Sequence, residues 1–259
     1  MIFTFCLIIL WNFSANEIYQ KTFQTANEAY YSGNFSVAID NYIKLIRGGI
    51  EDSIVFYNLG NAFYHLGKKG YSIACYQYAL ELNPSLSVAN ENLEKVLNET
   101  QRKLALPEEP LWWRYLFIFH YGISKVSTWI IATFFWIVGW VTFGVISWLP
   151  ISIRKYAIFL CVVFVILGTV FICSGIIKEF PYPKGVVVVE KTSAHILPSE
   201  NSPSRFELYE GDRFLVEREE SDWCLVRSVG NEKGWVKSKD ILIWSKLPVY
   251  LSSSEGIGM

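Results

Sequence analysis

The stretch Gly67–Pro84, GKKGYSIACYQYALELNP, has a counterpart 34 residues earlier in the chain. Apolar residues recur at helical spacing within each copy, so each copy predicts a pair of helices. These pairs are predicted over 20–32 and 36–46, and over 54–66 and 70–82. The positions that keep the offset with identical, small or apolar residues are Ala26/Gly60, Asn27/Asn61, Tyr30/Tyr64, Gly33/Gly67, Ala38/Ser72, Ile39/Ile73, Tyr42/Tyr76 and Leu45/Ala79.

The turns between the predicted helices carry residues that suit them. Gly33 and Gly67 lie between the helices of each pair, and glycine adopts positive φ without steric cost. Pro84 ends the fourth helix, because proline cannot continue one. A further helix is predicted over about 86–104, apolar at Leu93 and Val96 and polar at its end. We interpret it as the capping helix of a short repeat array.

The second copy resembles the tetratricopeptide repeat (TPR) family, whose period is also 34 residues. The matching residues are Phe56, Leu59, Gly60, Phe63, Tyr76, Ala79 and Pro84. The resemblance implies a TPR domain over 16–104 that binds partner proteins on the inner faces of its first helices. For Tyr30 and Tyr64 the alternative is simple packing between helices. The positions implied to bind a partner are Phe23, Asn27, Tyr30, Tyr31, Tyr57, Asn61, Tyr64 and His65.

Two uncharged apolar runs, at 126–149 and 156–177, are each long enough to cross a bilayer as a helix. Residues 150–155 form a short basic turn between them, with Arg154 and Lys155. The two runs therefore predict a transmembrane hairpin whose turn is cytoplasmic. Residues 105–125, rich in tryptophan and tyrosine, are predicted to be a linker and an interfacial aromatic segment.

The first fifteen residues contain an apolar run of the length found in signal peptides. We expect 1–15 to be an export signal; the alternative is an apolar helix that packs on its neighbours. Export and a cytoplasmic turn together predict a cytoplasmic (inner) membrane protein with both flanking blocks on the periplasmic side.

Residues 185–246 change to short β-branched and alternating runs with turn signals between them, which predicts a small all-β barrel. The block resembles bacterial SH3 domains through EGDRFLV at 210–216, through Trp223, and through Gly234, Trp235 and Val236. The resemblance implies peptidoglycan as a ligand; the alternative is that Trp223 and Trp235 belong to the barrel core or rim. Residues 247–259 are predicted to be a flexible tail.

Charge and cysteine usage exclude several function classes. The net charge is −1, and residues 16–110 and 179–259 are each at −3, so nucleic-acid binding has no electrostatic basis. The cysteines show no metal or disulfide spacing, and Cys75 and Cys224 are interpreted as small core residues. No phosphate loop, nucleophile elbow or zinc-protease motif is present. We therefore expect no enzyme, no cofactor and no metal.

The order of these parts, a signal, TPR units, a two-helix hairpin and an SH3-like barrel, resembles the BatE-type proteins of the Bat aerotolerance operon. That family belongs to bacterial gene clusters with a MoxR-type ATPase and von Willebrand A-domain membrane proteins. The resemblance implies a multidomain membrane protein that acts as an envelope scaffold in oxygen or stress tolerance, with those A-domain proteins and membrane lipid as partners. The alternative function is binding or sensing of peptidoglycan through the SH3-like domain.

Overall fold

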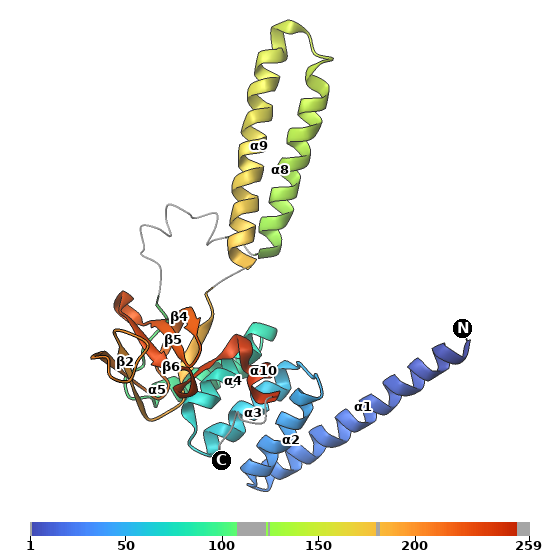
Figure 1. The fold of residues 1–259 in the computed structure, drawn as a ribbon. Helices are drawn as coiled ribbons and strands as arrows, with labels where there is room; N and C mark the ends of the chain where they lie inside the picture. The colour runs from blue at the N-terminus through green and yellow to red at the C-terminus, as the bar shows by residue number, and fades with distance from the viewer. Residues whose placement is uncertain (1, 108–122, 124, 180–181, 253–259) are drawn as a thin grey trace. The chain divides into compact units, whose positions relative to one another are not determined.

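The computed structural model describes residues 2–107, 123, 125–179 and 182–252, and it describes no side chains for residues 2–16, 125, 178 and 179. The chain divides into two compact units (Figure 1). The first unit is discontinuous and combines residues 1–107 with residues 183–259. The second is the segment between them, residues 108–182. The predicted linker and its aromatic residues at 108–122 lie outside the described residues.

Five helices form the N-terminal part of the first unit: α1 (Ile2–Tyr31), α2 (Phe35–Arg47), α3 (Ser53–His65), α4 (Lys69–Leu82) and α5 (Ser87–Asn98). The two predicted helix pairs are confirmed. Gly33 and Gly67 have positive φ angles of 81° and 73°, as the tight turns require. The Asp52 side chain caps α3 by accepting a hydrogen bond of 2.7 Å from the backbone N–H of Ile54.

Two helix boundaries differ from the sequence predictions. The structure has one continuous helix, α1, across the predicted signal peptide and the first repeat helix. The sequence between them, from Phe13 to Thr22, contains neither glycine nor proline to interrupt it. Cleavage of 1–15 stays a prediction. At the other end, α5 stops at Asn98 instead of 104. The polar residues after it turn away, with Lys103 at a positive φ of 48°.

The C-terminal part of the first unit is a small all-β domain. Seven strands of the described chain form one sheet in the order β3-β2-β6-β5-β4-β1-β7, and each described pair is antiparallel. The domain has a core of its own, built around Val187, Phe214 and Val226. The strands are β1 (Lys184–Val187), β2 (Lys191–His195), β3 (Ser204–Tyr209), β4 (Arg213–Glu220), β5 (Trp223–Arg227), β6 (Lys233–Lys237) and β7 (Ile241–Ile243).

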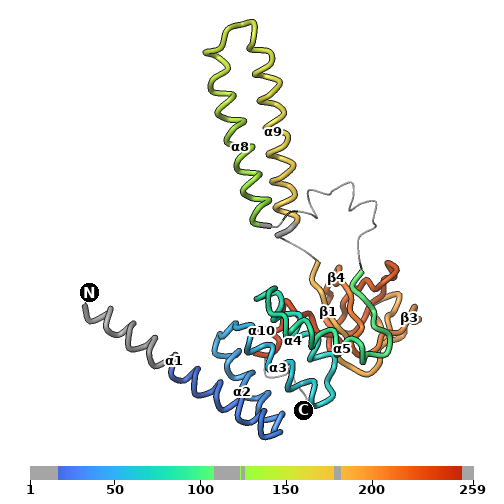
Figure 2. Tube along the Cα trace, turned by 180° about the vertical axis from the view of Figure 1, so that it is seen from behind, coloured from blue at the N-terminus to red at the C-terminus, as the bar shows by residue number. Residues whose placement is uncertain are grey.

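The predicted flexible tail is wrong for its first six residues. After β7 the chain forms the 3₁₀ turn η3 (Trp244–Lys246) and the helix α10 (Leu247–Ser252). Leu247 and Leu251 are buried, so this segment is part of the core. Figures 1 and 2 both show α10 beside α2 and α4, with which it is in contact. An apolar residue every fourth position on a short helix gives it a face to bury.

The helical array and the β domain share one hydrophobic core. Val186, Leu242 and Trp244 lie in the same buried cluster as Ile39, Leu59 and Ile73 of the helices. Cys75 is also buried there, and Cys224 is buried in the β domain, which confirms both as core residues. The sequence predicts separate TPR and β domains. The structure instead joins them, because apolar residues at the start and end of the β domain face the helices.

The second unit contains two long apolar helices, α8 (Lys125–Ile146) and α9 (Ile151–Glu179), paired as a hairpin. Their spans Val126–Ile146 and Ile151–Ile177 have mean hydropathies of 2.0 and 2.8 and are long and apolar enough to cross a membrane. Only 11% and 17% of their most apolar windows are buried. A core helix of a soluble protein buries most of its apolar surface, whereas these helices expose theirs, as membrane anchors do.

The hairpin packs small residues of α9 against large residues of α8. A Cβ added at Gly175 would lie 3.0 Å from the Trp129 ring, and one added at Gly168 would lie 3.2 Å from the backbone nitrogen of Trp136. The two glycines are seven residues apart on α9, and the two tryptophans are seven residues apart on α8. Residues at this spacing lie on the same face of a helix. Close approach through small residues is typical of helix pairs in membranes.

The predicted basic turn at 150–155 is displaced, because α9 begins at Ile151 and so includes Arg154 and Lys155. The Arg154 guanidinium donates hydrogen bonds to the carbonyl oxygens of Leu149 (3.1 Å) and Ser147 (3.4 Å). These carbonyls follow the end of α8, where backbone acceptors lack helical partners. Arg154 therefore closes the turn of the hairpin.

The substitution Gly168→Val is expected to destabilise the hairpin by about 1–3 kcal/mol, the usual cost of overpacking. Gly144→Val is the control, since a Cβ at Gly144 meets nothing within 4 Å. Thermal unfolding of both variants in detergent micelles, followed by tryptophan near-ultraviolet circular dichroism, measures the difference. Equal stability of the two variants would contradict the packing described here.

Candidate protein-binding surface

The first helices of the array, α1, α3 and α5, are joined to one another by side-chain contacts along one face. Asn58 Nδ2 donates to Asn27 Oδ1 (3.3 Å) and links α3 to α1. Asn92 Nδ2 donates to Asn61 Oδ1 (2.9 Å) and links α5 to α3. All eight residues predicted to bind a partner lie on α1 and α3.

An asparagine–tyrosine arrangement recurs in both repeats. The buried Tyr42 hydroxyl donates to Asn27 Oδ1 at 2.6 Å, and the buried Tyr76 hydroxyl donates to Asn61 Oδ1 at 2.6 Å. Each of these oxygens also accepts the bond from Asn58 or Asn92. We call these residues the amide ladder: Asn27, Tyr42, Asn58, Asn61, Tyr76 and Asn92.

The amide ladder fixes the orientation of its two central amides. The Oδ1 atoms of Asn27 and Asn61 each accept two hydrogen bonds from within the array. In the described part of the chain, nothing binds their Nδ2 groups, and both side chains are half-buried. Each repeat therefore presents one amide donor at the same position on the shared face.

The residues predicted from the sequence to bind a partner include Asn27 and Asn61 but not Asn58 or Asn92. The signal was present, since these two residues are also 34 positions apart. Sequence reasoning noted the period at Tyr42 and Tyr76 without assigning the hydroxyls a role. Their function as donors required knowing that the second helices turn their tyrosines toward the first helices.

An aromatic cluster occupies the turn end of the face. The His65 ring stacks on Phe35 with centroids 4.5 Å apart, and Tyr30 meets both rings edge-on. Tyr31 contacts Tyr30 and is 85% exposed. Tyr30 thus packs between the two repeats, as the alternative interpretation describes, while Tyr31 and His65 remain exposed.

The remaining predicted residues are tied to their neighbours. Phe23 stacks on Tyr19 at 5.9 Å, and the Tyr57 hydroxyl accepts a bond of 3.2 Å from Asn92 Nδ2. The Tyr64 hydroxyl donates to Glu99 at 2.8 Å, and the Lys95 ammonium lies 4.8 Å from the Tyr64 ring centroid. The structure therefore brings the eight residues onto one continuous face, although several of them also hold the array together.

Charge is absent from the centre of this face. Helix α3, SIVFYNLGNAFYH, contains no Asp, Glu, Lys or Arg. Amide donors and aromatic rings suit an uncharged extended segment, whose backbone carbonyls accept hydrogen bonds and whose apolar side chains contact the rings.

Comparison with known families supports the repeat assignment. Residues 53–86 match the tetratricopeptide repeat family. The match begins at the first residue of α3 and ends four residues after α4. The second repeat is thus confirmed as a tetratricopeptide unit. No curated protein matches the chain.

The substitution Asn61→Ala is expected to lower the free energy of unfolding by about 1–3 kcal/mol, because the buried Tyr76 hydroxyl loses its acceptor. Asn98→Ala, at the exposed end of α5, is the matched control and should be nearly neutral. Chemical denaturation followed by far-ultraviolet circular dichroism measures both. A neutral Asn61→Ala would show that the ladder does not stabilise the array.

Stability is also expected to fall in alkaline solution. Burial raises the pKa of Tyr42, Tyr71 and Tyr76 above the ordinary tyrosine value of 10.0. The unfolded chain therefore loses these protons first, and the free energy of unfolding decreases once the pH rises through about 10. Below that pH the contribution is fully present. Denaturation at a series of pH values checks this, and the double variant Tyr42→Phe/Tyr76→Phe should show a shallower decline.

Proposed function

We propose that this protein is a non-enzymatic, membrane-anchored scaffold that holds a partner protein on the face formed by α1, α3 and α5. The observation that carries the proposal is the amide ladder, which presents one oriented amide donor per repeat beside exposed aromatic rings. An extended peptide offers a backbone carbonyl and a side chain at regular intervals, which matches such a periodic surface. The uncharged centre favours a neutral segment, so binding should depend little on salt.

The opposite side of the array supports the choice of this face. The outer sides of α2 and α4 are covered by α10, η3 and β1 of the same chain. The Arg47 side chain donates a 2.9 Å hydrogen bond to the Leu251 carbonyl, and Trp244 donates one of 2.9 Å to Glu81. A partner therefore meets the chain's own C-terminal segment on that side.

The first unit is built from segments on both sides of the hairpin, which supports a two-span topology. Residues before 107 and after 183 share one hydrophobic core, so both must lie on the same side of any membrane that α8 and α9 cross. An even number of crossings satisfies this. With the N-terminal apolar run as an export signal, we place the first unit on the periplasmic side of the cytoplasmic membrane.

The order of the parts supports a role in a Bat-type envelope complex linked to oxygen or stress tolerance. In that setting the partners are von Willebrand A-domain membrane proteins. Tethering both proteins to one surface raises their effective concentration without any new contact. A scaffold of this kind needs no catalytic group and no cofactor.

A second candidate is peptidoglycan binding or sensing through the β domain. A cleft of about 430 Å³ is lined by polar side chains, among them Lys191, Thr192, His195 and Glu207. A neighbouring hollow contains Trp223, which meets His195 edge-on at 5.4 Å. Aromatic and polar groups together suit a saccharide or peptide ligand. Retention of the full chain on purified peptidoglycan, lost in Trp223→Ala, would favour this candidate; no retention removes it.

Site-specific photo-crosslinking in intact membranes tests the scaffold. A photoreactive residue at Tyr31 should crosslink a discrete partner, identified by mass spectrometry. The same probe at Val37, which is 50% exposed on α2, is the control and should not crosslink it. Asn61→Ala should reduce the yield from position 31 by about tenfold or more, as expected for loss of a central contact. Equal yields from both positions would contradict binding at this face.

Reporter fusions test the topology. Fusions after residue 110 and at the C-terminus should both report a periplasmic location, because the first unit is assembled from both flanks of the hairpin. Opposite locations for the two fusions would rule out the two-span arrangement.

A further inference from the structure

Helix α5 corresponds in position to the first helix of a third repeat. Asn92 on α5 occupies the position of Asn58 on α3, one period later, and makes the same bond to the preceding repeat. A turn follows at Lys103, and residues 103–107, the last ones described before residue 123, are not helical. In a stacked repeat, the second helix of a third repeat would lie beside the outer side of α4.

The β domain covers α4 in its place. Gly70, at the start of α4, donates its backbone N–H to Glu210 at 3.0 Å. A Cβ at Gly70 would lie 2.3 Å from the Val187 carbonyl oxygen, so only glycine allows this approach. Figure 2 shows β1 next to α4, with which it is in contact. The backbones of α4 and β1 are therefore in close contact at Gly70.

Apolar side chains after β7 extend this cover. Trp244 is 1% exposed and Leu247 is fully buried, both within the core of the helices. Burial of these side chains against the helices favours the docked arrangement, because apolar surface is removed from water. The C-terminal segment thus supplies the apolar surface that a second helix of a third repeat would supply.

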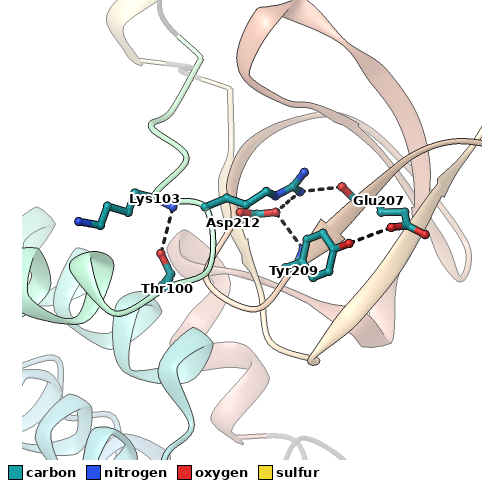
Figure 3. Close-up of polar contacts among 6 residues, drawn as sticks. Thr100, Lys103, Glu207, Tyr209 and Asp212 are labelled. Atoms are coloured by element: carbon teal, nitrogen blue, oxygen red, sulfur yellow. Dashed lines mark hydrogen bonds and ion pairs between the residues drawn. The ribbon is translucent and has the colours of Figure 1, made fainter.

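A polar lock holds the segment after α5 to the β domain (Figure 3). Arg102 donates to the Glu207 carbonyl at 2.6 Å and forms an ion pair with Asp212. Its guanidinium also lies 4.7 Å from the centroid of the Tyr209 ring. Asp212 is only 1% exposed and additionally accepts the backbone N–H of Tyr209 at 2.8 Å. An aspartate buried this deeply is costly without its cationic partner.

The same segment is attached to the protein-binding face. Glu99 accepts a bond from the Tyr64 hydroxyl at 2.8 Å, and its backbone carbonyl accepts one from Lys69 at 2.8 Å. Glu99 and Arg102 are three residues apart. Residues 99–102 are therefore held at one end by the face and at the other by the β domain.

We propose that the β domain serves as the cap of the helical array by covering the outer side of α4, and that its docking orders the α5 end of the protein-binding face. This role is independent of which partner the face binds. It also couples the helical array to the β domain, because release of the β domain would loosen α4, α5 and the Tyr64–Glu99 contact together.

Amide hydrogen exchange on the full chain in detergent micelles tests this. The variants are Gly70→Val, which prevents the close approach, and the milder Arg102→Met, which removes the lock. Arg218→Met is the matched control, because Arg218 is exposed and pairs only with Glu220 in the described chain. We expect exchange of α4 and α5 amides to rise by about tenfold or more in both variants, as for a sub-global opening.

The strands β4 and β5 should keep their protection in Arg102→Met, because their core around Phe214 and Val226 does not include the helices. Unchanged exchange of α5 in both variants would overturn the cap. An equal loss of protection over β4, β5 and all the helices in Arg102→Met would overturn it as well, since a cap must be separable from its own core. An increase in Arg218→Met similar to that in Arg102→Met would show that the effect is not specific to docking.

Discussion

The packing of the β domain onto the outer side of α4 is the contact on which the rest of the first unit depends. Two helix-pair repeats bury little apolar surface alone, and repeat arrays gain stability mainly from neighbouring units. Here the neighbour is not another repeat. It is the β domain, which follows the apolar hairpin in the sequence and packs its backbone against Gly70.

This contact constrains the whole chain. Because the core of the first unit contains residues from both flanks, the hairpin is an insertion into one folded unit and not a linker between two independent ones. The two helices of the hairpin pack against each other, with large side chains of α8 facing glycines of α9. The hairpin therefore does not need the first unit for its own packing. Each unit therefore has its own internal packing, and the two are linked because the hairpin is inserted in the sequence of the first unit.

Much of the helical part could be predicted from the sequence, because its information is local. A 34-residue period, glycines in the turns and proline after α4 specify the helix pairs, and long uncharged runs specify the hairpin. The shared core could not be predicted in this way. Val186, Trp244 and Leu247 look like ordinary core residues of a small barrel or its tail, and nothing in their spacing says that they face helices more than a hundred residues earlier. The Arg102–Asp212 pair was missed for the same reason, since each residue taken alone is typical of a solvated surface. For the candidate site, the period found the two central asparagines, but the hydroxyls that orient them come from the second helices.

The amide ladder places stabilising contacts and the proposed binding groups on the same residues. Asn27 and Asn61 use their oxygens for the interior and leave their nitrogens at the surface. An amide held by two hydrogen bonds has already lost its rotational freedom, so a partner that accepts from it does not bear that entropic cost again. The same reasoning applies to residues 99–102, which the β domain orders before any partner arrives. Under the proposed function, pre-organisation at both places lowers the entropic cost of holding an extended segment on the described repeats. The proposed cap follows the same reasoning, because α4 needs a rigid neighbour on its outer side and the β domain offers a backbone surface that fits against Gly70.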